Sequence, residues 1–118
     1  MKNFLTTLRA ASLWILLLPY AVGLTGAASN QLVLIANHDT FPVMMNSYAA
    51  AHVMPEGIDE EGHVLMTSQT HLNFLADVFD FHDGWMSIGD LLLMLGSWLS
   101  TFCPFVWAYV VISEVTRT

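Results

Sequence analysis

The stretch LLLMLGSWLSTFCPFVWAYVVIS, residues 91–113, runs for 23 positions without a charged residue. A helix of that length crosses the hydrocarbon core of a bilayer with some tilt. Just before it, Ser87-Ile88-Gly89-Asp90 fits the S-x-x-D capping pattern. This pattern predicts Ser87 as the N-cap and places Asp90 at the positive end of the helix dipole. We therefore predict a membrane-spanning helix over residues 88–113.

A second uncharged stretch, AASLWILLLPYAVGLTGAA, covers residues 10–28. As a helix it is about 28 Å long, close to the thickness of the hydrocarbon core. A secretory signal is the alternative, because Lys2 and Arg9 precede the apolar Leu13 to Leu18 and small residues follow at Gly26-Ala27-Ala28. We favour a retained anchor, and the cleaved signal stays open as the other interpretation.

Composition and charge support the membrane assignment. Of the 118 residues 55% are hydrophobic and only 11% are charged, whereas soluble domains carry roughly a quarter charged residues. The only cations are Lys2, Arg9 and Arg117, and nine of the ten acids lie between Asp39 and Asp90. Cationic flanks stay in the cytoplasm, so we expect an integral protein of the bacterial inner membrane with both termini cytoplasmic. The chain has no basic patch, which excludes nucleic-acid binding.

The predicted fold is mainly α: one membrane domain over residues 1–118, with an extracytoplasmic loop over residues 29–86. Residues 31–36 either extend the first helix or lie at the membrane interface. The residue before a proline avoids the helical region, so Phe41-Pro42-Val43 is expected to be extended. An amphipathic helix is predicted over residues 67–81, with Leu72, Leu75, Val78 and Phe79 on its apolar face. We expect Leu72, Leu75 and Phe79 to be buried against residues 41–43 or the membrane surface.

Several of these landmarks occur together in a known family. They are Asn37, Phe41-Pro42-Val43, His63, Thr70-x-Leu72-x-x-Leu75-x-Asp77 and Ser87-Ile88-Gly89-Asp90. In this combination the chain resembles, from Leu34 to about Gly96, a family of small bacterial and phage multi-pass membrane proteins known only as a domain of unknown function. The resemblance implies a membrane location and a loop followed by a hydrophobic helix. It implies no activity, cofactor or catalytic residue.

The loop histidines raise the question of a metal site, since imidazole and carboxylate groups suit Zn, Fe or Mn. The chain has five histidines: His38, His52, His63, His71 and His82. Their gaps of eight to fourteen residues match no close metal-binding spacing. His63, His71 and Asp77 are weak candidates, because a turn at Gly62 brings His63 beside the predicted helix. The prediction is no metal, no cofactor and no catalytic residue.

Small residues on the second hydrophobic stretch indicate a packing surface. Gly89, Gly96 and Cys103 recur every seven residues, and Ser100 follows four residues after Gly96. Such a stripe lets another membrane helix approach closely. The partner helix is the first helix, a second copy of the chain or part of a larger complex.

We favour a non-enzymatic accessory or structural membrane protein whose partners are the lipid bilayer and other membrane helices, with the acidic loop on the outer face. The first alternative is a phage- or mobile-element-encoded envelope effector that acts on a host membrane protein. The second is a metal-binding membrane enzyme or sensor that uses the loop histidines.

Overall fold

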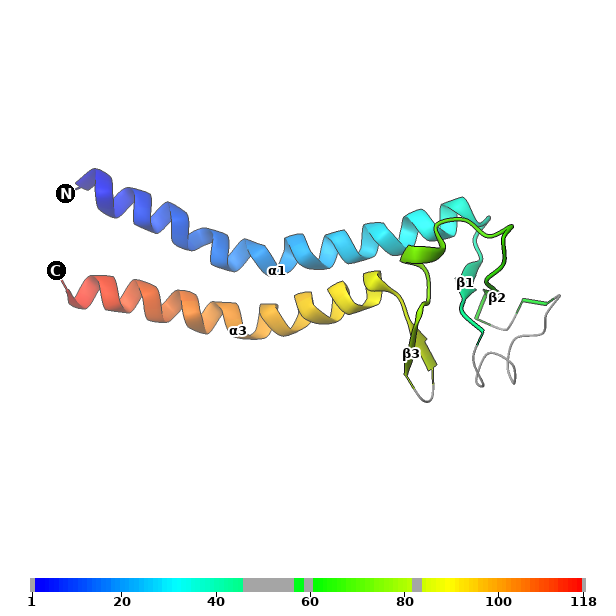
Figure 1. The fold of residues 1–118 in the computed structure, drawn as a ribbon. Helices are drawn as coiled ribbons and strands as arrows, with labels where there is room; N and C mark the ends of the chain where they lie inside the picture. The colour runs from blue at the N-terminus through cyan, green and yellow to red at the C-terminus, as the bar shows by residue number, and fades with distance from the viewer. Residues whose placement is uncertain (1, 46–56, 59–60, 82–83, 118) are drawn as a thin grey trace. The chain divides into compact units, whose positions relative to one another are not determined.

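A computed structural model of the chain describes residues 2–45, 57–58, 61–81 and 84–117 (Figure 1). Its elements are α1 (Lys2–Ala36), β1 (Phe41–Val43), β2 (His63–Leu65), the 3-10 helix η1 (Asn73–Leu75), β3 (Phe79–Phe81), β4 (Gly84–Met86) and α3 (Ile88–Thr116). They divide into two compact units. Unit 1 combines Met1–Leu24 with Leu93–Thr118, and unit 2 is Thr25–Leu92.

Both predicted hydrophobic helices are present. α1 contains the predicted residues 10–28 and extends beyond them at both ends, so that residues 31–36 continue the first helix. α3 contains the whole predicted range 88–113 and ends three residues later. By length and composition, Ser12–Ala36 and Ile88–Thr116 are long and apolar enough to cross a membrane.

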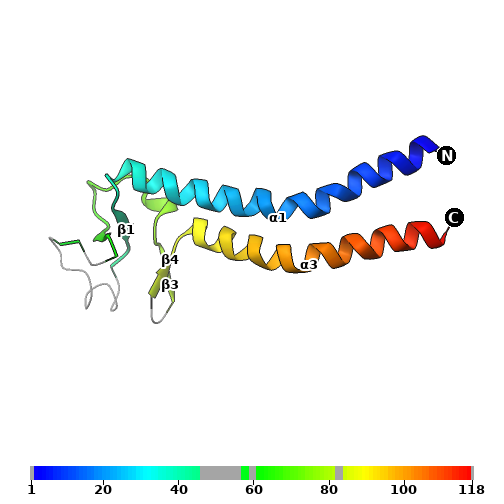
Figure 2. The same cartoon turned by 180° about the vertical axis from the view of Figure 1, so that it is seen from behind.

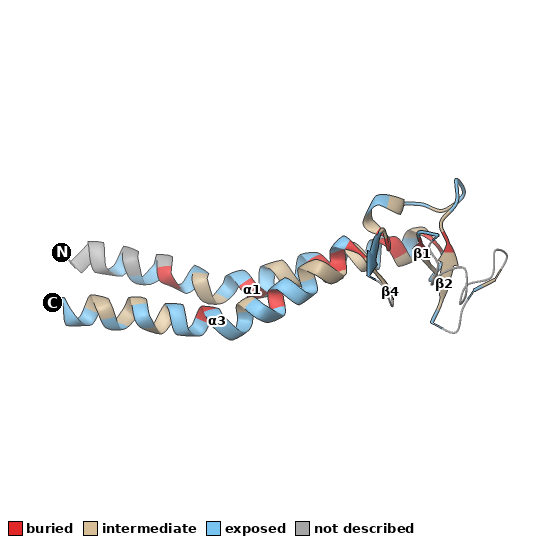
Figure 3. Ribbon diagram, turned by 60° about the horizontal axis from the view of Figure 1, so that its bottom comes forward, coloured by how far each residue is buried: buried red, intermediate tan, exposed pale blue. Residues whose placement is uncertain are grey.

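Within unit 1 the two helices lie side by side and antiparallel, so the start of α1 and the end of α3 lie at the same end (Figures 1 and 2). Only a narrow stripe of each helix is buried, and most of the remaining helical surface is exposed or half-buried (Figure 3). The exposed side chains include Trp14, Leu24, Phe105 and Tyr109. Apolar side chains on the outside of a helix pair are what a surrounding lipid phase requires.

Unit 2 contains short strands. β1 pairs in parallel with β2, and Val43 forms a single parallel bridge with Asp77 on the other side of β1. The expectation that residues 41–43 are extended is therefore confirmed. The backbone of Pro42 faces the Asp77 side of β1, and its carbonyl accepts the Asp77 N–H at 3.1 Å. Proline has no N–H to donate, and this is tolerated because the Asp77 side of β1 carries a single bridge and not a full paired strand.

The predicted amphipathic helix over residues 67–81 is wrong. Side chains close the first part into a turn: the Thr70 hydroxyl donates to the Thr67 carbonyl at 2.8 Å, and the Asn73 amide donates to the same carbonyl at 3.1 Å. Such local side-chain bonds compete with a helix. The end of the range forms β3, which pairs with β4 so that Phe81 lies opposite Gly84. The two aromatic side chains of β3, Phe79 and Phe81, are exposed.

The predicted burial of Leu72, Leu75 and Phe79 is also not found. Leu72 and Leu75 are only half-buried, and Phe79 is exposed. The buried apolar cluster of unit 2 is formed instead by Val43 and Leu65, with Trp85 packed against them. These residues come from β1, β2 and β4, so this cluster depends on the strands and not on the predicted helical face.

Candidate functional site

Asn37 joins the end of α1 to a segment 34 residues further along the chain. Its amide nitrogen donates to the Val33 carbonyl at 2.9 Å and to the His71 carbonyl at 2.8 Å. Its amide oxygen accepts the His71 N–H at 2.8 Å. The next residue, Leu72, has a φ of 55°, a left-handed conformation that is uncommon for a bulky side chain. The buried Asn37 side chain thus holds the chain where the backbone is strained.

A second hydrogen-bonded junction links α1 to the start of α3. The Ser87 hydroxyl accepts the Asp90 N–H, and the Asp90 carboxylate accepts the Ser87 N–H, both at 3.0 Å. The predicted N-cap is therefore confirmed as a reciprocal capping box. The junction is closed by Asn30 of α1, whose amide donates to Asp90 at 2.7 Å and accepts from the Ser87 hydroxyl at 2.8 Å.

The small-residue stripe of α3 lies partly against α1. A Cβ atom added to Gly96 would lie 2.9 Å from the Pro19 carbonyl oxygen, and one added to Gly89 would lie 2.7 Å from that of Gly26. Cys103 is buried, whereas Ser100 is exposed and donates to the Ser97 carbonyl. The stripe on α1 was missed in the sequence, although its buried residues also recur every seven positions: Ser12, Pro19, Gly26 and Val33.

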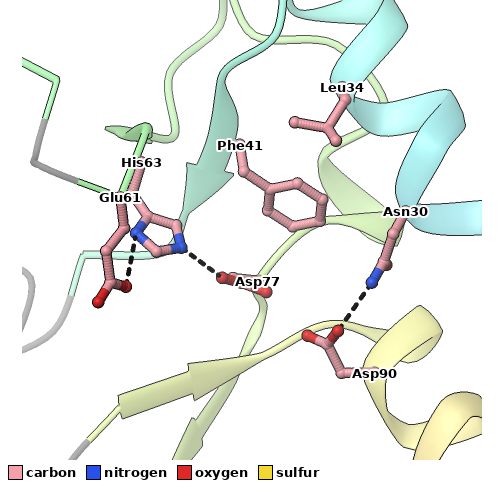
Figure 4. A pocket seen from close by; sticks show the side chains of 7 residues that line it. All are labelled: Asn30, Leu34, Phe41, Glu61, His63, Asp77 and Asp90. Atoms are coloured by element: carbon pink, nitrogen blue, oxygen red, sulfur yellow. Dashed lines mark hydrogen bonds and ion pairs between the residues drawn. The ribbon is translucent and has the colours of Figure 1, made fainter. Parts of the chain in front are cut away.

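A pocket of about 260 Å³ lies in unit 2. Its lining comes from α1, β1, β2 and the turn before β2, the bridge residue Asp77 and the start of α3: Asn30, Leu34, Phe41, Glu61, His63, Asp77 and Asp90 (Figure 4). The turn at Gly62 was expected to bring His63 beside a helix over residues 67–81, and that helix does not form. His63 Nε2 nevertheless lies 3.8 Å from Asp77 Oδ2. His63 Nδ1 lies 3.7 Å from a Glu61 carboxylate oxygen. The imidazole also makes an edge contact with Trp85 at a centroid distance of 5.1 Å.

Asp77 is the most constrained acid of this pocket. It is 3% exposed, and within the part of the chain that the structure describes, its Oδ1 atom has no hydrogen-bond partner. Burial raises the pKa of the carboxyl from 3.8 to about 7; the negative charge of Asp90 adds to the increase, and His63 opposes it. A buried acid that changes charge near neutral pH is characteristic of functional sites.

His71, the third weak metal candidate, is not among the residues that line the pocket. Its backbone is held by Asn37 and its side chain is exposed. Over residues 2–45, 57–58, 61–81 and 84–117, no three His, Cys, Asp or Glu side chains are grouped so that they could hold a metal ion. His52 and His82 lie outside the described residues.

Sequence reasoning missed five of the seven residues that line the pocket: Asn30, Leu34, Phe41, Glu61 and Asp90. Asp90 was assigned only to the helix cap, although a cap residue at the start of α3 also faces the end of α1. No local pattern marks Asn30, because its role depends on the antiparallel register of the two helices. The bridge between Val43 and Asp77 brings the remaining side chains together, and a single bridge leaves no periodic signal in the sequence.

Comparison with known proteins identifies one family. Its model, described as a family of unknown function (DUF5317), matches residues 12–102, which include every pocket residue. The resemblance to a family of unknown function is thereby confirmed. No curated protein and no solved structure matches the chain.

Proposed function

Since the chain belongs to this family of unknown function, we propose its role from its own structure: a small, non-enzymatic accessory protein of a membrane. In this proposal α1 and α3 cross the bilayer as an antiparallel pair, and their outward faces contact lipid and other membrane helices. The acidic segment between them lies on the outer side. The observation that carries the proposal is the outward apolar surface of unit 1, where Trp14 is 71% and Tyr109 74% exposed.

The glycines of α3 already pack against α1 of the same chain. Gly96 approaches Pro19 and Gly23 within unit 1, and Gly89 approaches Gly26 within unit 2. A partner helix would therefore contact the outward faces and not the glycine stripe. A surface that suits such a contact is a groove of about 360 Å³ on α3, lined by Ser97, Trp98, Thr101 and Phe102. The Ser97 and Thr101 hydroxyls donate to carbonyls of α3. The rest of the groove is formed by the Trp98 and Phe102 rings, which suit the apolar interior of a bilayer.

The expected orientation follows from charge. Lys2 and Arg9 precede the apolar part of α1 and Arg117 follows α3, and no Lys or Arg lies between Arg9 and Arg117. Cationic flanks are retained in the cytoplasm, so compartment reporters placed at Glu60 and after Thr118 should report opposite sides of the inner membrane. Both reporters on one side would contradict the proposed topology, because α3 would then not cross.

The accessory role is tested by the mass of the purified complex. Extraction of the full-length chain in a gentle detergent, followed by native mass spectrometry, should yield a stoichiometric complex with a second membrane protein. Thr101→Leu fills the groove and should reduce the bound partner about tenfold, as expected for a central interface residue. Val106→Leu, also on the outward face of α3, should retain it. A wild-type chain that carries only lipid would contradict the accessory role.

A further inference from the structure

The pocket of unit 2 is lined by more acidic than basic side chains. Among the described residues that line it, Asp77, Asp90 and Glu61 are acidic and His63 alone is basic. No lysine or arginine occurs between Arg9 and Arg117, so unit 2, residues 25–92, contains no permanently charged cation. A buried carboxylate is stable only when it is protonated or paired with a positive charge. Asp77 is the buried acid of this pocket, and when it is ionised its pairing charge is either the His63 imidazole or a cation bound from outside the chain.

The arrangement of Asp77 indicates where such a cation would bind. In Figure 4 its carboxylate lies between the His63 imidazole and the Asp90 carboxylate, within the pocket. Oδ2 faces His63, whereas Oδ1 is buried without a hydrogen-bond partner among the described residues. A buried acceptor without a donor costs free energy, and a bound donor that carries positive charge removes this cost.

The remaining lining identifies the class of ligand. The residues that the structure describes include no three-ligand metal group, and about 260 Å³ is more space than a bare ion fills. Leu34 and Phe41 add an apolar wall opposite the acids. An ammonium group supplies N–H donors to carboxylates and is attracted to the face of an aromatic ring, and an attached alkyl chain suits an apolar wall.

We propose that this pocket binds an alkylammonium group, with its nitrogen at the Asp77 carboxylate and its alkyl chain against Leu34 and Phe41. The group is either a free amine or the side chain of a lysine on another protein, since both present the same chemistry. The inference does not depend on the proposed membrane function, because every residue used lies in unit 2. If the pocket binds no amine, the proposed topology and the proposed membrane complex still hold.

The test is calorimetric titration of the purified full-length chain at pH 8 with n-butylammonium chloride, with n-butanol as the uncharged control. We expect saturable one-to-one binding of the amine and none of the alcohol. Asp77→Asn preserves the shape of the side chain and should weaken binding at least about tenfold, because a hydrogen bond to a charged group is lost. Asp80→Asn, on the exposed β3, is the matched control and should bind within about twofold of wild type.

Two further titrations test the proposal. Lowering the pH from 8 to 5.5 should weaken binding, because Asp77 then becomes neutral beside His63, Glu61 and Asp90. A parallel titration with Nα-acetyl-lysine amide identifies the source: equal binding points to a lysine side chain, and binding of n-butylammonium alone points to a free amine.

The proposal is overturned if neither amine binds the wild type saturably, or if Asp77→Asn binds as tightly as wild type. If that variant fails to fold, NMR of the wild type decides. The His63 imidazole signals should shift on addition of n-butylammonium while those of His71 do not, and an unchanged His63 would overturn the proposal equally.

Discussion

Gly96→Ala is expected to disrupt the pairing of α1 and α3 in unit 1. The added methyl group would lie 2.9 Å from both the Pro19 carbonyl oxygen and the Gly23 nitrogen, and 3.0 Å from the Gly23 Cα. These are backbone atoms, so no side-chain rotation relieves the contact and the helices must separate. Forced overpacking of this kind costs about 1–3 kcal/mol or more. Unfolding of the purified chain in mixed micelles, followed by circular dichroism, measures the loss.

Gly23→Ala is the control for that experiment, because Gly23 lies directly opposite. A Cβ atom at Gly23 has no heavy atom within 4 Å, so the substitution should leave the pairing intact. Alanine also favours a helix by about 1 kcal/mol over glycine, which should keep the variant at least as stable as the wild type. If Gly96→Ala behaves like Gly23→Ala, the close approach at Gly96 does not hold the helices together.

Raising the pH from 5 to 8 should destabilise unit 2. The folded-state pKa of Asp77 is about 7, against an ordinary value of 3.8, so the native state binds this proton more tightly than the unfolded chain does. The stabilisation is complete below the unfolded pKa and is lost as the pH rises through 7. A shift of this size corresponds to a loss of about 2–3 kcal/mol across the interval. Chemical unfolding of the wild type at both pH values, in the absence of amines, measures it.

Asp77→Asn should remove most of this pH dependence, because asparagine stays neutral and its shape is nearly that of the protonated acid. At pH 8 the variant should be more stable than the wild type. Asp80→Asn should retain the wild-type dependence, since that acid is exposed on β3. Unchanged pH dependence in Asp77→Asn would assign the proton to another group.

The helices could be predicted because their signals are local. Long uncharged runs define α1 and α3, and Ser87 and Asp90 mark the start of α3 within four residues of sequence. Residues 67–81 were mispredicted because Leu72, Leu75 and Phe79 have helical spacing, whereas their conformation is decided by contacts to distant residues. Asn37 binds His71 from 34 positions away, and Asp77 pairs with Val43.

Of the residues that line the pocket, only His63 and Asp77 were candidates from the sequence. The turn at Gly62, where φ is 87°, was expected to place His63 beside a helix that does not form, and the closeness of His63 to Asp77 depends instead on the bridge between Asp77 and Val43. The inclusion of His71 assumed that residues 71 and 77 share a helix, and it fails with that helix. Asn30 and Asp90 enter the pocket through the register of α1 against α3, which no single segment encodes.

The junction of Asn30, Ser87 and Asp90 has a consequence for how the family can diverge. Two hydrogen bonds cap α3 and two attach it to α1, and the Ser87 and Asp90 side chains take part in both pairs, so a change at either of them alters both functions at once. Replacing Ser87 alone leaves the Asn30 amide oxygen without its donor, and replacing Asn30 alone leaves the Asp90 carboxylate one donor short. Substitutions at these three positions are therefore not independent, and relatives that differ at one of them should carry compensating changes at the others.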